Sequence, residues 1–323
     1  MRRQSRRRNM IALSLVFLLL GSDRTSTERN RLRATVAAAA LVEERFETVF
    51  YANADLLLST GRYKQLSEQS ANTLRLPFAD LIGGLESLGP HASADLLSKA
   101  DAVLIGARDF RPPATLGDVQ SQFCYVVVLA GDNTSILART TKLPGVSEEE
   151  GSVWKWAAKP TEGSRSPAQY YATQVGGSYL VITSNLDGLR LMAQKLASSK
   201  GGTSPPLAPS IRDWEAISQH EVWGYRNYYH NEAENNKEAA GTSEIMSDAQ
   251  ALAFFVDLKQ QVGVLRLYSS AADTPHKINA KHMLPSLDEV NTGLWEAKVS
   301  LSGDQTLQPM VNVMGLFGFA IYL

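Results

Sequence analysis

The segment 178–198 contains a strand, a cap and a helix in succession, and it constrains the fold more than any other part of the chain. Its first residues read SYLVIT, which is rich in the β-branched and aromatic residues that favour strands. Asn185 stands where a polar side chain can cap a helix. Leu189, Met192 and Leu196 follow at a spacing that places them on one helical face. The segment therefore predicts a helix that packs one apolar face against a sheet.

Several other segments have the composition of strands, and the strongest of them is QFCYVVVLA at residues 122–130. Its continuous apolar run predicts a strand that is buried on both faces. Cys124 lies in this strand, so we expect a buried, unreactive thiol. Further strands are predicted at residues 102–106, 262–268 and 295–301.

Three segments favour helices outside the segment already described. Ala34 to Phe50 is rich in alanine and glutamate, which are strong helix formers, and residues 213–218 and 248–258 are also expected to be helical. Short helices with breaks are expected between residues 51 and 100. At the C-terminal end, two glycines within residues 310–323 favour a final buried strand over a membrane helix.

The stretch SSKGGTSPPLAPS at residues 198–210 has the Gly, Pro and Ser content of a linker. It divides the chain into a first part, 34–197, and a second part, 211–323, after a flexible lead-in at 23–33. We predict an α+β fold with two subdomains, each of mainly antiparallel strands packed with helices. Both parts begin helix-rich and end strand-rich. They share no clear residue-level repeat, so an internal duplication stays open.

The N-terminus has the pattern of a secretory signal. Five arginines precede residue 9, and the apolar run Met10 to Gly21 follows them. This run is shorter than the roughly 20 residues that span a bilayer. Residues 1–22 are therefore predicted to direct export to the periplasm or cell envelope. The site around Leu19–Ser22 resembles a cleavage site poorly, so an uncleaved signal anchor in the inner membrane, formed by residues 10–21, stays open. Membrane contact is expected only through this segment.

Charge and motif content argue against several classes of function. The chain has 32 basic and 33 acidic residues, which gives no reason to expect nucleic acid as a partner. With a single cysteine it cannot form an intramolecular disulfide or a cysteine-based zinc site. The nucleophile elbow, the phosphate-binding loop, the dinucleotide-binding glycines and the HExxH metal motif are all missing from the sequence. We therefore expect no enzyme, no cofactor and no metal.

The stretch HEVWGYRNYYHNEAE at 220–234 has the densest aromatic content of the chain. Aromatic rings beside Arg and Asn can form a recognition surface, because they bury area at low entropic cost and keep polar tips. An aromatic-rich core strand is the alternative reading. The histidine and glutamate spacing fits solvated loop residues better than a metal site. The candidate binding residues are Trp223, Tyr225, Arg226, Tyr228, Tyr229 and His230.

The middle third of the chain resembles exported, functionally uncharacterised proteins of soil bacteria of the acidobacterial type. The residues that carry the resemblance are ADAVLIGARDF at 100–110, QFCYVVVLA at 122–130 and SYLVITSNLDGLRLMAQKLA at 178–197. The resemblance implies export, and it implies no activity or catalytic residue.

Together these features predict an exported envelope protein that acts as a non-enzymatic binding or interaction module. The expected partner is a protein, peptide or glycan of the envelope. An envelope hydrolase with a site assembled from scattered residues, and a membrane-anchored scaffold, are the alternatives.

Overall fold

The structure is a computed structural model. It describes residues 31–44, 46–53, 99–109, 121–129, 145–149, 151–157, 169–198, 213–227, 249–257, 260, 262–271, 273, 275–276 and 286–300. The predicted signal segment, the short helices before residue 99, the predicted linker beyond Ser198 and the final strand at 310–323 lie outside these residues.

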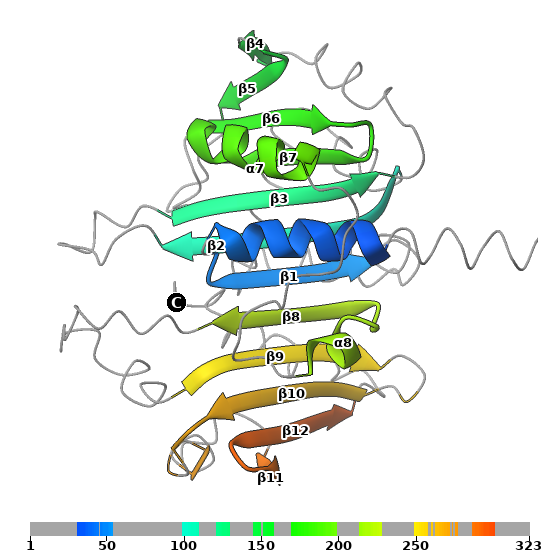
Figure 1. Cartoon of the computed structure of the whole chain (residues 1–323), viewed down its shortest axis with the longest axis vertical. Coiled ribbons are helices and arrows are strands. Elements are labelled where there is room, and N and C mark those ends of the chain that lie inside the picture. Colours follow the sequence, from blue (N-terminus) through cyan, green and yellow to red (C-terminus); the bar gives the residue numbers. More distant parts are fainter. Residues whose placement is uncertain are drawn as a thin grey trace, which may run out of the picture.

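Twelve strands form one antiparallel sheet in the order β11-β12-β10-β9-β8-β1-β2-β3-β7-β6-β5-β4 (Figure 1). The predicted strands at 102–106, 122–130, 262–268 and 295–301 are confirmed as β2, β3, β10 and β12. The bounds are β1 Thr48–Asn53, β2 Ala100–Asp109, β3 Ser121–Leu129, β4 Ser147–Glu149, β5 Val153–Ala157, β6 Gln169–Val175, β7 Tyr179–Thr183, β8 Val222–Asn227, β9 Ala249–Asp257, β10 Val262–Ser269, β11 Asp288–Asn291 and β12 Leu294–Ser300.

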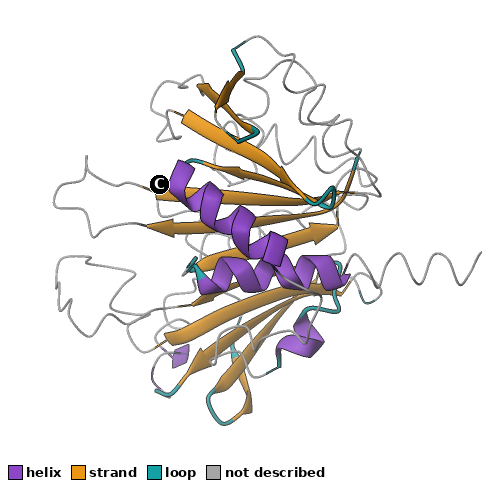
Figure 2. Cartoon of the chain, turned by 45° about the horizontal axis from the view of Figure 1, so that its top comes forward, coloured by secondary structure: helices purple, strands orange, loops and turns teal. Residues whose placement is uncertain are grey.

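Helices cover one face of this sheet. The helix at residues 31–43 lies over the centre of the sheet, and α7 (Leu186–Ser198) lies beside it on the same face (Figure 2). The one-turn helix α8 (Trp214–Ile217) directly precedes β8. The mixed α+β character predicted from the sequence is therefore confirmed, with the sheet as the larger component.

The predicted cap and apolar face of α7 are both confirmed. The Asn185 Oδ1 accepts a hydrogen bond of 2.9 Å from the backbone N–H of Gly188, in the first turn of the helix. Leu189, Met192 and Leu196 are the buried residues of α7. The turn before β7 contains Gly176 and Gly177 at φ 56° and 71°, a conformation that side chains other than glycine rarely adopt.

Two helix predictions are wrong in extent or kind. The first helix ends at residue 43 instead of 50, because the β-branched and aromatic residues from Thr48 onward form β1 between two other strands. The helix also includes residues 31–33, which we expected to be part of the flexible lead-in. The predicted helix at 248–258 is β9, whose apolar residues are buried on both faces of the sheet.

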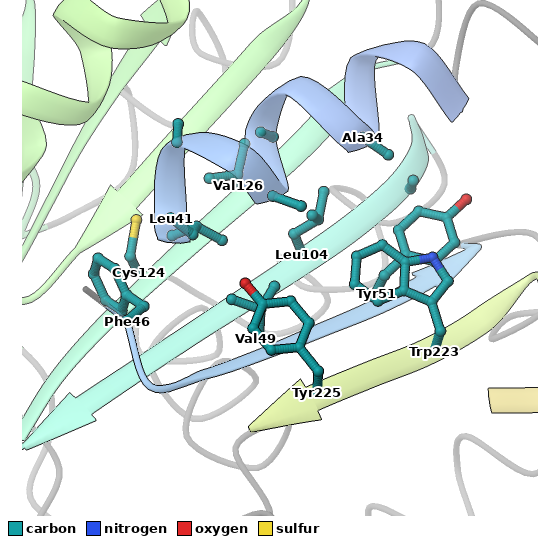
Figure 3. Packing of buried hydrophobic residues seen from close by; sticks show 14 of the residues in the cluster. Ala34, Leu41, Phe46, Val49, Tyr51, Leu104, Cys124, Val126, Trp223 and Tyr225 are labelled. Atoms are coloured by element: carbon teal, nitrogen blue, oxygen red, sulfur yellow. The ribbon is translucent and has the colours of Figure 1, made fainter. Parts of the chain in front are cut away.

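One hydrophobic core cluster lies between the sheet and these helices (Figure 3). Ala34, Ala37 and Ala38 are almost fully buried, and their small side chains let the first helix pack close to the sheet. Cys124 is fully buried in β3, as predicted. Lys195 of α7 pairs with Glu43 at 3.2 Å and with Glu44, which ties the end of the first helix to α7.

The sheet runs without interruption from the first part of the chain to the second. β1 pairs with β2 on one side and with β8 on the other. The register on the β8 side runs from Thr48 opposite Arg226 to Ala52 opposite Val222. The two parts of the chain therefore contribute to one sheet and meet at its centre.

Candidate functional site

Two of the predicted binding residues are core residues. Trp223 is 2% exposed and Tyr225 is fully buried, so the expectation that these rings reach the surface is wrong. The Trp214 ring meets both of them edge to face, with ring centroids 4.6 Å and 5.9 Å apart, and Tyr51 stacks on Trp223 at 5.0 Å. The physical reason is that β8 is a central strand, whose two neighbours and overlying α8 leave its aromatic side chains no route to solvent.

The other predicted binding residues are distributed differently. Arg226 is half-buried and lies on the opposite face of β8 from Trp223 and Tyr225, because alternate residues of a strand point to opposite faces. Tyr228, Tyr229 and His230 lie outside the described residues. The structure thus brings Trp223 and Tyr225 together in the core and does not join Arg226 to them.

A charged cluster on the helix-covered face of the second part is the candidate site instead. We call Asp213, Phe255, Arg266, Tyr268 and Glu296 the Arg266 cluster. The Arg266 guanidinium donates from Nε to Glu296 Oε2 at 3.0 Å and from a terminal nitrogen to Asp213 Oδ2. The Tyr268 hydroxyl donates to the other oxygen of Asp213. One guanidinium therefore holds two carboxylates that come from different elements.

The Arg266 guanidinium packs on the ring of Phe255, and this ring also contacts a histidine. The guanidinium carbon of Arg266 lies 5.0 Å from the centroid of the Phe255 ring, within the range of a cation–π contact. The His220 ring stacks on the same ring, with centroids 4.2 Å apart and an interplanar angle of 17°. Phe255 thus links the charged residues of β10 and β12 to the histidine that precedes β8.

The cluster is partly open to solvent. The side chains of Asp213, Arg266 and Glu296 are 29%, 19% and 13% exposed. Lys298 is 70% exposed and lies next to them, with its Nζ 3.4 Å from Glu296 Oε1. A polar partner can therefore reach the carboxylates and Lys298 from the solvent side.

Burial shifts two titrations in and beside this cluster. Burial raises the pKa of Tyr268 to about 12, and the positive charge of Arg266 offsets only part of this effect. Burial lowers the pKa of His220 below its ordinary value of 6.5, although Asp257 and a backbone contact at Val256 act in the opposite direction. Tyr268 is therefore a neutral donor and His220 an uncharged ring at neutral pH.

Both carboxylates of the Arg266 cluster and the neighbouring His220 ring are engaged in contacts. Both carboxylates are held by Arg266, so neither is poised as a general base. His220 stacks on an apolar ring and is not next to a nucleophilic side chain in the contacts of the described region. Among the described residues, no group of three or more His, Cys, Asp or Glu side chains is placed to hold a metal ion.

Sequence reasoning missed the Arg266 cluster, although one signal was available. Arg266 is the one charged residue in the otherwise apolar strand VGVLRLYS, and such a residue needs an acid on the same face of a neighbouring strand. The acid is Glu296, directly opposite Arg266 in the β10–β12 register. The sequence alone does not reveal this pair, because the register between strands 30 residues apart is not visible in the alternation of either strand.

Comparisons with known proteins leave the chain without an assigned family. No protein-family model and no curated protein matches it. Among solved structures it is similar to crystal forms I, III and IV of TP0453, with TM-scores of 0.43, 0.44 and 0.42 and identities of 8%, 10% and 9%. The matches cover 84%, 84% and 82% of this chain and 94%, 94% and 92% of the other.

In the part of the chain that the structure describes, no helix combines the length and the apolar composition that a membrane span requires.

Proposed function

We propose that the protein is exported to the bacterial cell envelope and acts there as a non-enzymatic binding or interaction module. The Arg266 cluster is its proposed contact site, and the partner is a protein, peptide or glycan with polar groups. The observation that carries the proposal is the way the charges are held. Asp213 and Glu296 both bind the Arg266 guanidinium, which packs on the Phe255 ring. The result is a fixed polar surface in which both carboxylates are already paired.

The export part of the proposal rests on the arginines and the apolar run of residues 1–22. A fusion of residues 1–40 to a reporter that is active only in the periplasm should be active. Replacing Arg2, Arg3, Arg6, Arg7 and Arg8 by glutamate provides the control and should abolish that activity. Reporter protein confined to the cytoplasm would contradict export.

Binding at the Arg266 cluster can be tested with a photo-crosslinking amino acid at position 298 of the full chain in cells. Position 191 on α7 is the control, because Leu191 is also exposed and lies on the first part of the chain. We expect an adduct at position 298 that disappears in the variant Asp213→Ala/Arg266→Val/Glu296→Val. Identical adducts at both positions, or an adduct that survives this variant, would argue against the site.

The poor cleavage site at Leu19–Ser22 supports a second candidate, a scaffold anchored in the inner membrane by residues 10–21. Fractionation of cells that express the full chain distinguishes the exported form from the anchored form, since an anchored chain stays with the membrane after washing with carbonate.

In either form, we propose that residues 34–197 and 211–323 are two subdomains that share the sheet. An envelope hydrolase would instead show a substrate turnover that is lost in His220→Ala.

A further inference from the structure

The two parts of the chain repeat the same strand order outward from the centre of the sheet. From β1 the neighbours run β2, β3, β7 and β6, and from β8 they run β9, β10, β12 and β11. In each part a three-strand meander is followed by a hairpin whose last strand pairs with the third strand of the meander. The centre of this arrangement is the antiparallel pair β1 and β8 (Figure 1).

The repeat extends to individual irregularities. In the first part, Ala100 faces Leu129 while Ala102 faces Val128, so one residue of β2 is extra. In the second part, Ala249 faces Ser269 while Ala251 faces Tyr268, so one residue of β9 is extra at the corresponding place. Register irregularities of this kind are specific local features, and their coincidence is not required by the strand order.

Single hydrogen bonds beside these irregularities also repeat. The N–H of Leu129, at the end of β3, donates to the carbonyl of Ser178 in the next hairpin turn at 2.9 Å. The N–H of Ser269, at the end of β10, donates to the carbonyl of Gly293 in its hairpin turn at 3.0 Å. The third strand of each part is therefore fixed to its hairpin in the same way.

The junction itself has two-fold character. The N–H of Asn53 donates to the carbonyl of Glu221 at 2.9 Å, and the N–H of Asn227 donates to the carbonyl of Glu47 at 2.7 Å. The two bonds are equivalent: in each, the asparagine that ends one central strand donates to the glutamate that precedes the other. The segments ETVFYAN and EVWGYRN that contain them share Glu, Tyr and Asn at the same positions.

The helices that precede the two central strands end alike. The N–H of Glu44 donates to the carbonyl of Ala40 at 3.1 Å, and the N–H of Ser218 donates to the carbonyl of Trp214 at 2.8 Å. Four residues separate the end of each helix from the start of its strand. The short α8 thus takes the place of the last turn of the helix at 31–43.

From this set of coincidences we infer that the chain consists of two copies of one β-rich unit, and that the β1–β8 contact is a dimer interface fused into a single chain. At this interface, β1 of the first copy forms antiparallel strand pairing with β8 of the second copy. The inference does not depend on the proposed function, because it concerns the junction and not the Arg266 cluster.

A pseudo-two-fold axis relates the two units and passes through the centre of the β1–β8 pair. One residue pair on this axis explains why the first unit pairs with the second and not with another first unit. Phe50 faces Gly224 at the centre of the β1–β8 register. A Cβ on Gly224 would lie 3.3 Å from Cδ2 of Phe50 and 3.2 Å from the carbonyl oxygen of Val49. Two first units would place phenylalanine against phenylalanine at this point, so the large and small pair provides specificity.

The interface can be tested on the folded full chain with a protease recognition sequence inserted between Gly202 and Thr203. After cleavage we expect the two fragments to elute together in native buffer and to separate only in denaturant. Fragments that separate in native buffer would overturn the inference of a self-sufficient interface.

The central pair gives a second test in the same cleaved chain. Gly224→Phe should weaken the association of the fragments at least tenfold, and Phe50→Gly/Gly224→Phe should restore most of it. Ala172→Leu, in the distant strand β6, is the control and should leave the association unchanged. If the fragments of Phe50→Gly/Gly224→Phe associate no better than those of Gly224→Phe, the pair Phe50 and Gly224 does not determine the specificity of the interface.

Discussion

The ring of Phe46 lies against the backbone of Gly106, so closely that a Cβ at Gly106 would be 2.9 Å from its Cδ1. The same Cβ would be 2.8 Å from Cδ2 of Leu41. Phe46 is 1% exposed and Leu41 is fully buried, so neither side chain can move outward to solvent. A glycine in β2 therefore makes the space into which the end of the first helix packs.

Gly106→Ala is accordingly expected to overpack this part of the core. We expect a loss of about 1–3 kcal/mol in the free energy of unfolding, measured by chemical denaturation. Leu41→Ala/Gly106→Ala is the informative companion, since it removes one of the two close contacts. Its loss should be smaller than the sum of the two single losses, and simple additivity would contradict the packing argument.

The cap of α7 offers a local test on the other helix. Asn185→Ala removes the acceptor of the Gly188 N–H and should lower the free energy of unfolding by about 0.5–2 kcal/mol. Asn185→Asp keeps an acceptor at the same position and should retain most of the stability. Equal losses in the two variants would show that the cap hydrogen bond is not the cause.

The parts of the fold that the sequence predicted correctly are those set by local patterns. The cap and apolar face of α7 and the apolar strand β3 each depend on residues within one short segment. β9 was predicted as a helix because a strand buried on both faces has no alternation, and its alanines and leucine also favour helices. The junction of β1 with β8 joins residues far apart in sequence, so no local pattern contains it.

The candidate site shows the same division between local and distant information. Trp223 and Tyr225 were predicted as part of an aromatic binding surface but are core residues, because their burial depends on β1, β9 and Trp214, which only the fold brings together. Arg266 stands out as the one charged residue of its strand, but nothing in that strand identifies its partner Glu296. Their pairing follows from the β10–β12 register.

His220 is expected to make the stability depend on pH in the mildly acidic range. Its pKa in the folded state lies below 6.5, so the unfolded chain binds this proton more tightly than the folded chain. The contribution of His220 is therefore complete above about pH 6.5, and the free energy of unfolding falls as the pH decreases below that value. Denaturant titrations at a series of pH values between about 5 and 8 measure this slope.

His220→Phe provides the control for that slope, because it keeps an aromatic ring on Phe255 and removes the titrating group. Phe46 precedes β1 at the place where His220 precedes β8, so the second unit should accept the substitution. The variant should lose most of the dependence between about pH 5 and 6.5. An unchanged slope would assign the effect to another group.

Removing Arg266 alone should cost the protein stability, whereas replacing the three charged residues of the Arg266 cluster together should cost little. Arg266→Val alone removes the cation that Asp213 and Glu296 share, and we expect it to lower the free energy of unfolding by about 1–3 kcal/mol. In the first unit, the positions equivalent to Asp213, Arg266 and Glu296 hold Ala39, Val126 and Val181, of which the two valines are fully buried.

Replacing all three charged residues by their counterparts, as Asp213→Ala/Arg266→Val/Glu296→Val, should therefore recover most of the stability that Arg266→Val loses. Apolar residues of suitable volume often replace a partly buried ion network without a net loss, because the cost of removing the charges from water disappears with them. Denaturation of the wild type, the single variant and the triple variant in one buffer decides the matter. A triple variant that is less stable than Arg266→Val would show that the cluster is required for the fold of the second unit, and the case for it as a dedicated contact site would be lost.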